Sequence, residues 1–156
     1  MPGDERDKAG VIAPPPLIYI GALVFGLLLN RRLSVAFLPR GVARGLGWTL
    51  LGAGVLLLGW FERAMRQADT PASPYKPVSR IATVGPFRYT RNPGYLSMAM
   101  IDAGIAARAN ALWAILLLPV ALLVIQRGVI EREERYLEDK FGEEYLSYKA
   151  RVRRWI

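Results

Sequence analysis

The sequence contains no cysteine and no histidine among its 156 residues. Without cysteine the chain cannot form a disulfide, a thiolate zinc site or a cysteine nucleophile. Without histidine it lacks the most common metal ligand and the most common general base near neutral pH. We therefore expect no metal site, and any chemistry must depend on carboxylates, tyrosines, backbone groups or a bound cofactor.

Acidic residues are also few, because 13 Asp and Glu stand against 21 Lys and Arg, which gives a net charge of +8. Such an excess is typical of nucleic-acid-binding proteins and of membrane proteins with basic cytoplasmic segments. Hydrophobic residues make up 53% of the chain. They collect in blocks with the charges between them, so we expect the lipid bilayer as a partner and no nucleic acid.

The apolar blocks divide the chain into a short leader and one domain. Residues 1–10 are polar and of mixed charge, and we expect them to be disordered and not a cleaved signal peptide. Residues 11–156 are predicted to form a single membrane domain, in which residues 70–156 carry the binding motifs. Its four apolar blocks are candidates for transmembrane helices, and they cover residues 14–30, 42–61, 93–107 and 111–126.

Prolines, glycines and short polar turns predict where the helices begin and end. Pro14–Pro16 mark the start of the first helix, because proline is tolerated only in the first turn. The short turn at residues 108–110 requires the third and fourth blocks to form an antiparallel hairpin. After Arg127 the spacing of apolar residues predicts an amphipathic helix that ends near Gly142, followed by a second short helix. The predicted fold is all-α, an integral membrane bundle of about four transmembrane helices with a helical hairpin and a C-terminal amphipathic helix.

The basic residues predict an orientation in the membrane. Most of them lie before residue 11, in residues 62–92 and after residue 126, which four spans would place on one side. We therefore expect both termini in the cytoplasm and the protein in the inner, cytoplasmic membrane. Four arginines between the first two blocks oppose this bias. Glycines in the second block predict close helix packing within or between chains, so the oligomeric state stays open.

The segment at residues 85–96 is best suited to bind a ligand. Asn92 and Pro93 form a helix-start signal. Free backbone N–H groups at a helix start bind anions, and Arg88 and Arg91 would help. A cofactor carboxylate or a substrate phosphate would suit this site. An ordinary turn followed by a helix cap, with Arg and Tyr as interfacial anchors, explains the same residues.

Two carboxylates are predicted to lie in apolar surroundings. Glu134 falls on the apolar stripe of the amphipathic helix, together with Ile130, Leu137 and Phe141. A carboxylate in that position needs a cationic partner, either Arg91, Arg127 or another arginine, or the cationic group of a ligand. Asp102 lies in the middle of the third block, where a carboxylate usually faces the bundle interior. Asp102 is expected either to form a hydrogen bond with a neighbouring Trp or Tyr or to have a functional role, and the sequence leaves both alternatives open.

Two motifs flank the predicted hairpin. The first is Gly-Pro-Phe-Arg-Tyr-Thr-Arg-Asn-Pro-Gly-Tyr-Leu at residues 85–96, and the second is Arg-Glu-Glu-Arg-Tyr-Leu at residues 132–137, followed by Phe-Gly-Glu-Glu-Tyr at residues 141–145. Together they resemble the membrane methyltransferase family of isoprenylcysteine carboxyl methyltransferase and phospholipid methyltransferase. The resemblance covers residues 70–156 well and the first two helices only in general character. Asn92 stands where isoprenylcysteine methyltransferases carry histidine, and it can donate a hydrogen bond but cannot titrate.

The resemblance implies a cofactor, S-adenosylmethionine, bound between the hairpin and the C-terminal segment near the cytoplasmic face. It implies that Arg91 is catalytic by orienting the substrate, and that Glu133 and Glu134 hold the amino group of the cofactor. The full set of cofactor-binding residues that it implies is Gly85, Pro86, Arg88, Tyr89, Asn92, Pro93, Tyr95, Glu133 and Glu134.

The resulting hypothesis is an integral membrane enzyme that methylates a lipid-like or amphiphilic acceptor on a carboxylate or an amine. Methyl transfer from a sulfonium is an in-line displacement that depends on alignment, so the missing histidine is no obstacle. One alternative is a methyltransferase of a thiol or another small molecule on the same scaffold. The other is a non-catalytic membrane protein that serves as a scaffold or interaction partner.

Overall fold

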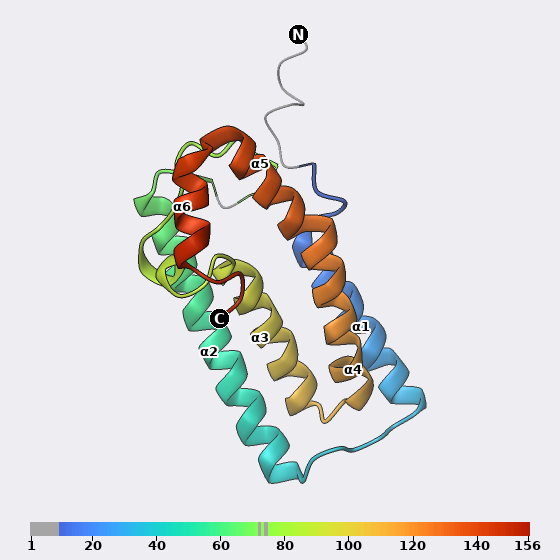
Figure 1. Ribbon diagram of the computed structural model, residues 1–156. Coiled ribbons are helices and arrows are strands. Elements are labelled where there is room, and N and C mark those ends of the chain that lie inside the picture. Colours follow the sequence, from blue (N-terminus) through green and yellow to red (C-terminus); the bar gives the residue numbers. More distant parts are fainter. Residues whose placement is uncertain (1–9, 72, 74) are drawn as a thin grey trace.

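The computed structural model describes residues 10–71, 73 and 75–156, and this part of the chain is helical without any strand. Figure 1 shows the helices, whose order is α1 (Pro15–Arg32), α2 (Arg40–Gln67), α3 (Pro93–Arg108), α4 (Leu112–Ile125), α5 (Glu131–Phe141) and α6 (Glu143–Arg151). A 3₁₀ turn, η1 (Gly85–Arg88), precedes α3, and a π-helix, η2 (Gln126–Ile130), joins α4 to α5. The all-α prediction is therefore confirmed. Residues 1–10 were expected to be disordered. Residues 1–9 lie outside the part of the chain that the structure describes.

Small residues bring the long helices into close contact. The most extensive pairings join α2 to α3 and α1 to α4. A Cβ atom added at Gly104 of α3 would lie only 2.6 Å from the backbone nitrogen of Leu51 in α2. At Gly26 of α1 it would lie 2.4 Å from the Cα of Ala114 in α4. Helices can approach this closely only where no side chain intervenes, which explains part of the glycine content of the bundle.

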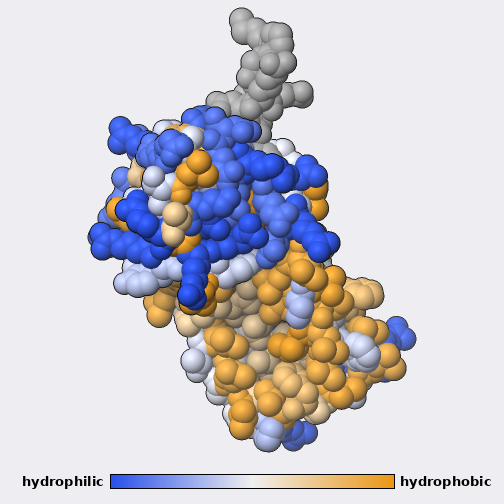
Figure 2. Space-filling view, in the orientation of Figure 1, coloured by the Kyte–Doolittle hydropathy of each residue, from blue (hydrophilic) through white to orange (hydrophobic). Residues whose placement is uncertain are grey.

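The outer surface of the bundle is apolar at one end and polar at the other. Figure 2 shows the hydrophobic residues gathered over the half of the molecule that lies away from α5 and α6. Many large apolar side chains are exposed there, and Leu56 of α2 reaches 77% exposure. Two helical runs are long and apolar enough to cross a membrane, Arg40–Gln67 and Leu112–Phe141. By length and composition these two helical runs of the described residues are candidates for membrane spans, where the sequence predicted about four.

The predicted hairpin of α3 and α4 is present, and its turn lies at the apolar end (Figure 1). Asn110 occupies this turn with a φ of 50°. Its side-chain oxygen accepts hydrogen bonds from the backbone nitrogens of Phe37 (3.2 Å) and Leu38 (3.1 Å). Its amide nitrogen donates to the oxygen of Leu38 at 2.7 Å. The turn therefore ties down the connection between α1 and α2 as well.

The polar end of the molecule carries the remaining elements. The segment between α2 and α3, both short helices α5 and α6, and the last residues of the chain gather there (Figure 1). α5 ends at Gly142, whose φ of 53° suits glycine, and the predicted helix end is confirmed. The sequence also predicted that residues 62–92 and the residues after 126 lie on the same side of the bundle. In the structure the segment between α2 and α3 and the elements α5 and α6 lie at the same end.

Candidate active site

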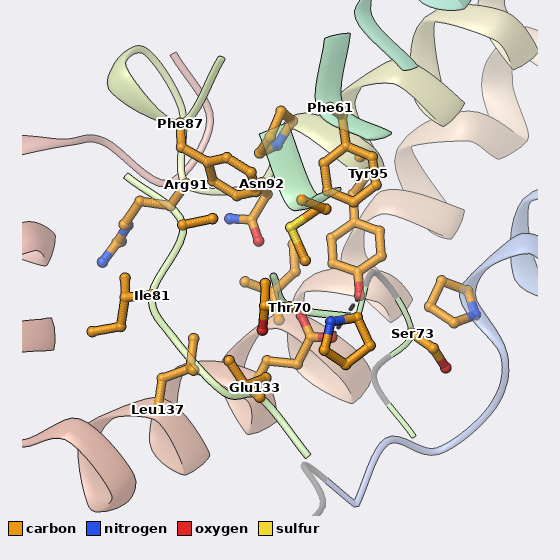
Figure 3. Close-up of a pocket in the computed structure, with 18 of the residues that line it drawn as sticks. Phe61, Thr70, Ser73, Ile81, Phe87, Arg91, Asn92, Tyr95, Glu133 and Leu137 are labelled. Carbon is orange, nitrogen blue, oxygen red and sulfur yellow. Dashed lines mark hydrogen bonds between the residues drawn. The ribbon is translucent and has the colours of Figure 1, made fainter. Parts of the chain in front are cut away.

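A cavity of about 510 Å³ lies at the polar end, where the bundle meets the covering segments. Its walls come from the end of α2, the segment that follows it, the start of α3, the short helices α5 and α6, and Pro14–Pro16 at the start of α1. Most of the lining is apolar. The residues that give it this character are Phe61, Met65, Ile81, Ala82, Phe87, Met98, Ile130 and Leu137 (Figure 3).

One carboxylate of the cavity is held by a tyrosine. The hydroxyl of Tyr95, in the first turns of α3, donates to Oε1 of Glu133 in α5 at 2.7 Å, and Figure 3 shows the two side chains pointing toward each other. The backbone oxygen of Tyr95 accepts a hydrogen bond from the hydroxyl of Tyr19 in α1 at 3.0 Å. Within the described part of the chain no cation pairs with Glu133. Its carboxyl group is therefore not engaged by a cation of the protein and can bind one of a ligand.

The neighbouring carboxylate, that of Glu134, is already neutralised by the protein. Glu134 is only 6% exposed. Its two oxygens accept hydrogen bonds from Nε and Nη2 of Arg154, at 3.0 and 2.8 Å. Nη2 of Arg91 lies 3.2 Å from Oε1. The hydrogen bond to Glu134 raises the pKa of Arg154, an effect that outweighs its partial burial. The Nζ of Lys149 lies 4.0 Å from Oε2. The sequence required a cationic partner for Glu134, and Arg91 is one of three, with Arg154 and Lys149.

The guanidinium of Arg91, a residue of the cavity wall, keeps two unused donors. Its side chain is 9% exposed. Nε and Nη1 are buried, and no acceptor among the described residues reaches them. A buried donor without a partner costs about 1–3 kcal/mol, so such a group is normally satisfied by something that the site binds. Arg91 and Glu133 both line the cavity, and Figure 3 shows them on different parts of its wall. The cavity therefore offers a guanidinium and a carboxyl group at separate positions.

Two tyrosines of α6 close the cavity on a further side. The hydroxyl of Tyr148 donates to the backbone oxygen of Phe87 at 2.8 Å, which ties α6 to the first motif. Burial raises the pKa of Tyr148, and the nearby guanidinium of Arg91 opposes that rise. Burial also raises the pKa of Tyr145, and the charge of Glu134 adds to it. Both phenols are therefore neutral hydrogen-bonding groups at any physiological pH.

The structure brings most of the predicted site residues together. Six of them line the cavity: Arg91, Asn92, Pro93, Tyr95, Glu133 and Glu134. The other four do not, namely Gly85, Pro86, Arg88 and Tyr89. Arg88 is exposed, and Tyr89 is 68% exposed with its ring against that of Trp60. Gly85 and Pro86 form the 3₁₀ turn that sets Phe87 into the cavity wall.

The helix-start signal works differently from the expected way. Asn92 is the residue before α3, but its side chain makes no capping hydrogen bond. Its amide nitrogen donates instead to the backbone oxygen of Arg154 at 2.9 Å. The expectation of an asparagine cap is therefore wrong. The side chain of Asn92 makes a tertiary hydrogen bond to Arg154 instead of the local capping hydrogen bond that the sequence predicted.

Sequence reasoning missed several residues of the cavity and its surroundings. They include Thr70, Tyr75, Lys76, Arg80, Tyr145 and Tyr148 in the lining, and Arg154 next to it. Tyr145 and Tyr148 are three residues apart, and this helical spacing on a short polar helix is a signal that could have indicated them. Arg154 has no local signal, because only the fold brings it to Glu134.

Comparisons with known proteins agree with this geometry. The phospholipid methyltransferase family matches residues 42–144, more than half of the chain. The chain is also similar to an uncharacterized protein of Haemophilus influenzae, with 57% identity over 37 residues. That match covers 24% of this chain and 59% of the relative. No solved structure gives a significant match. The family match spans both motifs around the cavity, and the chain therefore belongs to the phospholipid methyltransferase family of membrane proteins.

Proposed function

We propose that the protein transfers a methyl group from S-adenosylmethionine to a lipid-like or amphiphilic acceptor, at a carboxylate or an amine. The bound cofactor would supply an electrophilic methyl group on a sulfonium. The residues of the chain would hold its amino-acid end, exclude water from the cavity and align the acceptor with that methyl group. Membership of a methyltransferase family supports the reaction class.

One observation carries the proposal: the mostly apolar cavity is lined by a guanidinium with two unused donors and by a carboxyl group that no cation of the described chain binds. S-adenosylmethionine ends in an ammonium and a carboxylate on one carbon. In this assignment the ammonium lies at Glu133, whose charge no cation of the described chain neutralises. The carboxylate lies at Nε and Nη1 of Arg91, which are buried and without a partner. Charge-assisted hydrogen bonds of this kind are about twice as strong as neutral ones.

The surroundings of the cavity support an amphiphilic acceptor. The cavity lies where the apolar half of the surface meets the polar half (Figure 2). Its apolar lining, with Pro14–Pro16 at one wall, suits a hydrocarbon chain better than a charged metabolite. Arg91 is a residue of the site that we propose to contact the cofactor directly, because its two unused donors would bind the cofactor carboxylate. Arg88 and Tyr89 are exposed, and we leave them out of the proposed site.

For the membrane we propose that α1 and α3 cross it together with the two long apolar runs. At about 1.5 Å per residue, the 18 residues of α1 extend about 27 Å, close to the thickness of the hydrocarbon core. We propose that the protein lies in the inner membrane. The polar end, which contains the cavity, would then face the cytoplasm. Protease protection of α5 and α6 in sealed vesicles of known orientation tests this topology.

The binding test compares two cofactors on detergent-solubilised protein by calorimetry. Arg91→Gln should weaken S-adenosylmethionine binding about ten- to a hundredfold, since hydrogen bonds to a charged group contribute about 1.5–3 kcal/mol. Decarboxylated S-adenosylmethionine lacks the carboxylate, and its affinity should not respond to Arg91→Gln. The control is Arg88→Gln, in the same motif but exposed, which should change neither affinity.

Two outcomes would contradict the assignment in different ways. If Arg91→Gln weakens the binding of both compounds equally, Arg91 does not bind the cofactor carboxylate. Failure of the unaltered protein to bind either compound would remove the methyltransferase proposal and favour a non-catalytic role. The acceptor is identified by transfer of a labelled methyl group in the presence of lipid extract. A base-labile lipid product indicates a carboxylate, a base-stable lipid product indicates an amine, and a water-soluble product indicates a thiol or another small molecule.

A further inference from the structure

The segment after α6 returns to the site instead of leaving it. The backbone N–H of Arg91 donates to the oxygen of Arg153 at 2.9 Å. The oxygen of Arg154 accepts hydrogen bonds from the hydroxyl of Thr90 at 3.1 Å and from the side chain of Asn92 at 2.9 Å. Three consecutive residues of the first motif are thus bound to two carbonyl groups of this segment.

The same segment reaches the second motif through one side chain. Arg154 binds both oxygens of Glu134 with its planar guanidinium, a two-point contact that a lysine cannot make. Beyond it, Nε1 of Trp155 donates to Oε1 of Gln126 in the π-helix at 3.2 Å. Arg154 is therefore anchored on either side, by its own carbonyl and by the next residue.

The charges explain what this arrangement does for Arg91. Glu134 carries one negative charge, and two guanidinium groups share it. Arg154 engages both carboxylate oxygens and so fixes the plane of the carboxylate. Arg91 can then reach Oε1 with Nη2 only. Nε and Nη1 of Arg91 are left without a partner among the described residues. Arg154 has a second, longer contact of 3.8 Å to Glu131, and Lys149 lies 4.0 Å from Glu134.

We propose that Arg154 is a positioning residue of the site. It holds Glu134 in one orientation, and through Glu134 and the carbonyl groups of the segment it presents the free donors of Arg91 to the cofactor carboxylate. The inference rests on the proposed function for the identity of the ligand. The arrangement of Arg91 itself is independent of that identity and can be measured separately.

The experiment uses Arg154→Ala, Arg154→Lys and the control Arg153→Ala. The side chain of Arg153 is exposed, and it makes no hydrogen bond or ion pair with the described residues, although its backbone lies in the same segment. Arg154→Ala should weaken S-adenosylmethionine binding about tenfold, because a charge-assisted two-point contact is lost one step away from the ligand. The effect should be seen in KM, with kcat nearly unchanged, since a cofactor carboxylate is bound equally before and during the reaction. Arg154→Lys should recover part of the affinity, and millimolar guanidinium should restore Arg154→Ala.

Hydrogen exchange of the Arg91 amide provides the readout that needs no ligand. Its hydrogen bond to Arg153 should open more often in Arg154→Ala than in Arg153→Ala, so exchange should be faster. The proposal is overturned if Arg154→Ala retains wild-type affinity and wild-type exchange, or if Arg153→Ala has the same effects. If Arg154→Ala does not fold, Arg154→Lys takes its place. The proposal is then overturned if Arg154→Lys shows wild-type affinity and wild-type exchange. If the wild-type protein binds no S-adenosyl compound, the proposed function fails while the exchange data still decide the role of Arg154.

Discussion

Glu133 and Glu134 are adjacent in the sequence but differ in what they can bind. Glu133 receives one hydrogen bond, from Tyr95, and pairs with no cation of the described chain. Glu134 lies between Arg91 and Arg154. Replacing each in turn by glutamine removes one negative charge and almost no volume. We predict that Glu133→Gln mainly weakens cofactor binding and that Glu134→Gln mainly weakens the fold.

The contacts set the magnitudes. In Glu133→Gln the new amide oxygen can still accept the hydrogen bond of Tyr95, so the free energy of unfolding should fall by no more than about 1 kcal/mol. Loss of a buried ammonium–carboxylate pair costs about 2–5 kcal/mol, which at 1.4 kcal/mol per tenfold weakens binding at least about thirtyfold. Glu134→Gln leaves Arg91 without its anion and leaves Arg154 with only the longer contact of 3.8 Å to Glu131. Breaking a buried pair costs about 3–5 kcal/mol, and the partial exposure of Arg154 reduces this to about 2–4 kcal/mol.

The assay has two arms on the same detergent-solubilised proteins. Denaturant titration gives the free energy of unfolding, and calorimetry with S-adenosylhomocysteine gives the affinity of the folded fraction. The reasoning is refuted if folded Glu134→Gln loses as much affinity as Glu133→Gln, because Glu134 would then bind the ammonium despite its two arginines. It is equally refuted if Glu133→Gln binds like the unaltered protein.

Three further predictions concern packing and the turns. Gly104→Ala places a Cβ 2.6 Å from a backbone atom of Leu51 and should destabilise the protein by about 1–3 kcal/mol. Gly52→Ala, which meets nothing within 4 Å, should stabilise it by up to about 1 kcal/mol, and denaturation in mixed detergent micelles compares the two. Asn110→Ala loses three hydrogen bonds and a residue suited to positive φ, and should cost about 1–3 kcal/mol while cofactor affinity, measured by calorimetry, stays unchanged. Tyr148→Phe should lower the free energy of unfolding by about 1 kcal/mol, because it loses the hydrogen bond to the backbone oxygen of Phe87. A thermal melt at neutral pH measures this, and an unchanged melting temperature would show that the bond does not stabilise the fold.

Local signals predicted the helix ends well. The prolines before α1, Pro93 and Gly142 restrict or free the backbone by themselves, and the helices begin and end where these residues stand. Burial of Glu134 also followed from helical periodicity, since the spacing to its apolar neighbours needs no tertiary information. What periodicity could not supply was the partner. Arg154 reaches Glu134 only because the segment after α6 folds back, and no local pattern encodes that return.

Tertiary contacts also explain where the sequence reasoning failed. Asn92 was expected to cap α3, but the carbonyl of Arg154 competes for its side chain. Arg88 and Tyr89 belong to the same motif as Arg91, yet the 3₁₀ turn leaves them on the outer surface. A motif identifies a segment, while the direction of each side chain depends on the turn that precedes it.

The π-helix between α4 and α5 has a consequence for which changes of length the chain can accept. A π-turn contains one residue more than the α-helical turn that it replaces, and each residue advances an α-helix by about 100°. α4, η2 and α5 are continuous from Leu112 to Phe141. Deletion of one residue within Gln126–Ile130 would therefore convert the π-turn into an α-turn and leave the phase of α5 nearly unchanged, whereas deletion of one residue in the α-helical part of α4 would rotate α5 by about one position relative to the bundle. Tyr95 would then face a different side chain from Glu133, although every residue of the second motif would still be present. The helical phase of α5, and not only its sequence, is part of the site.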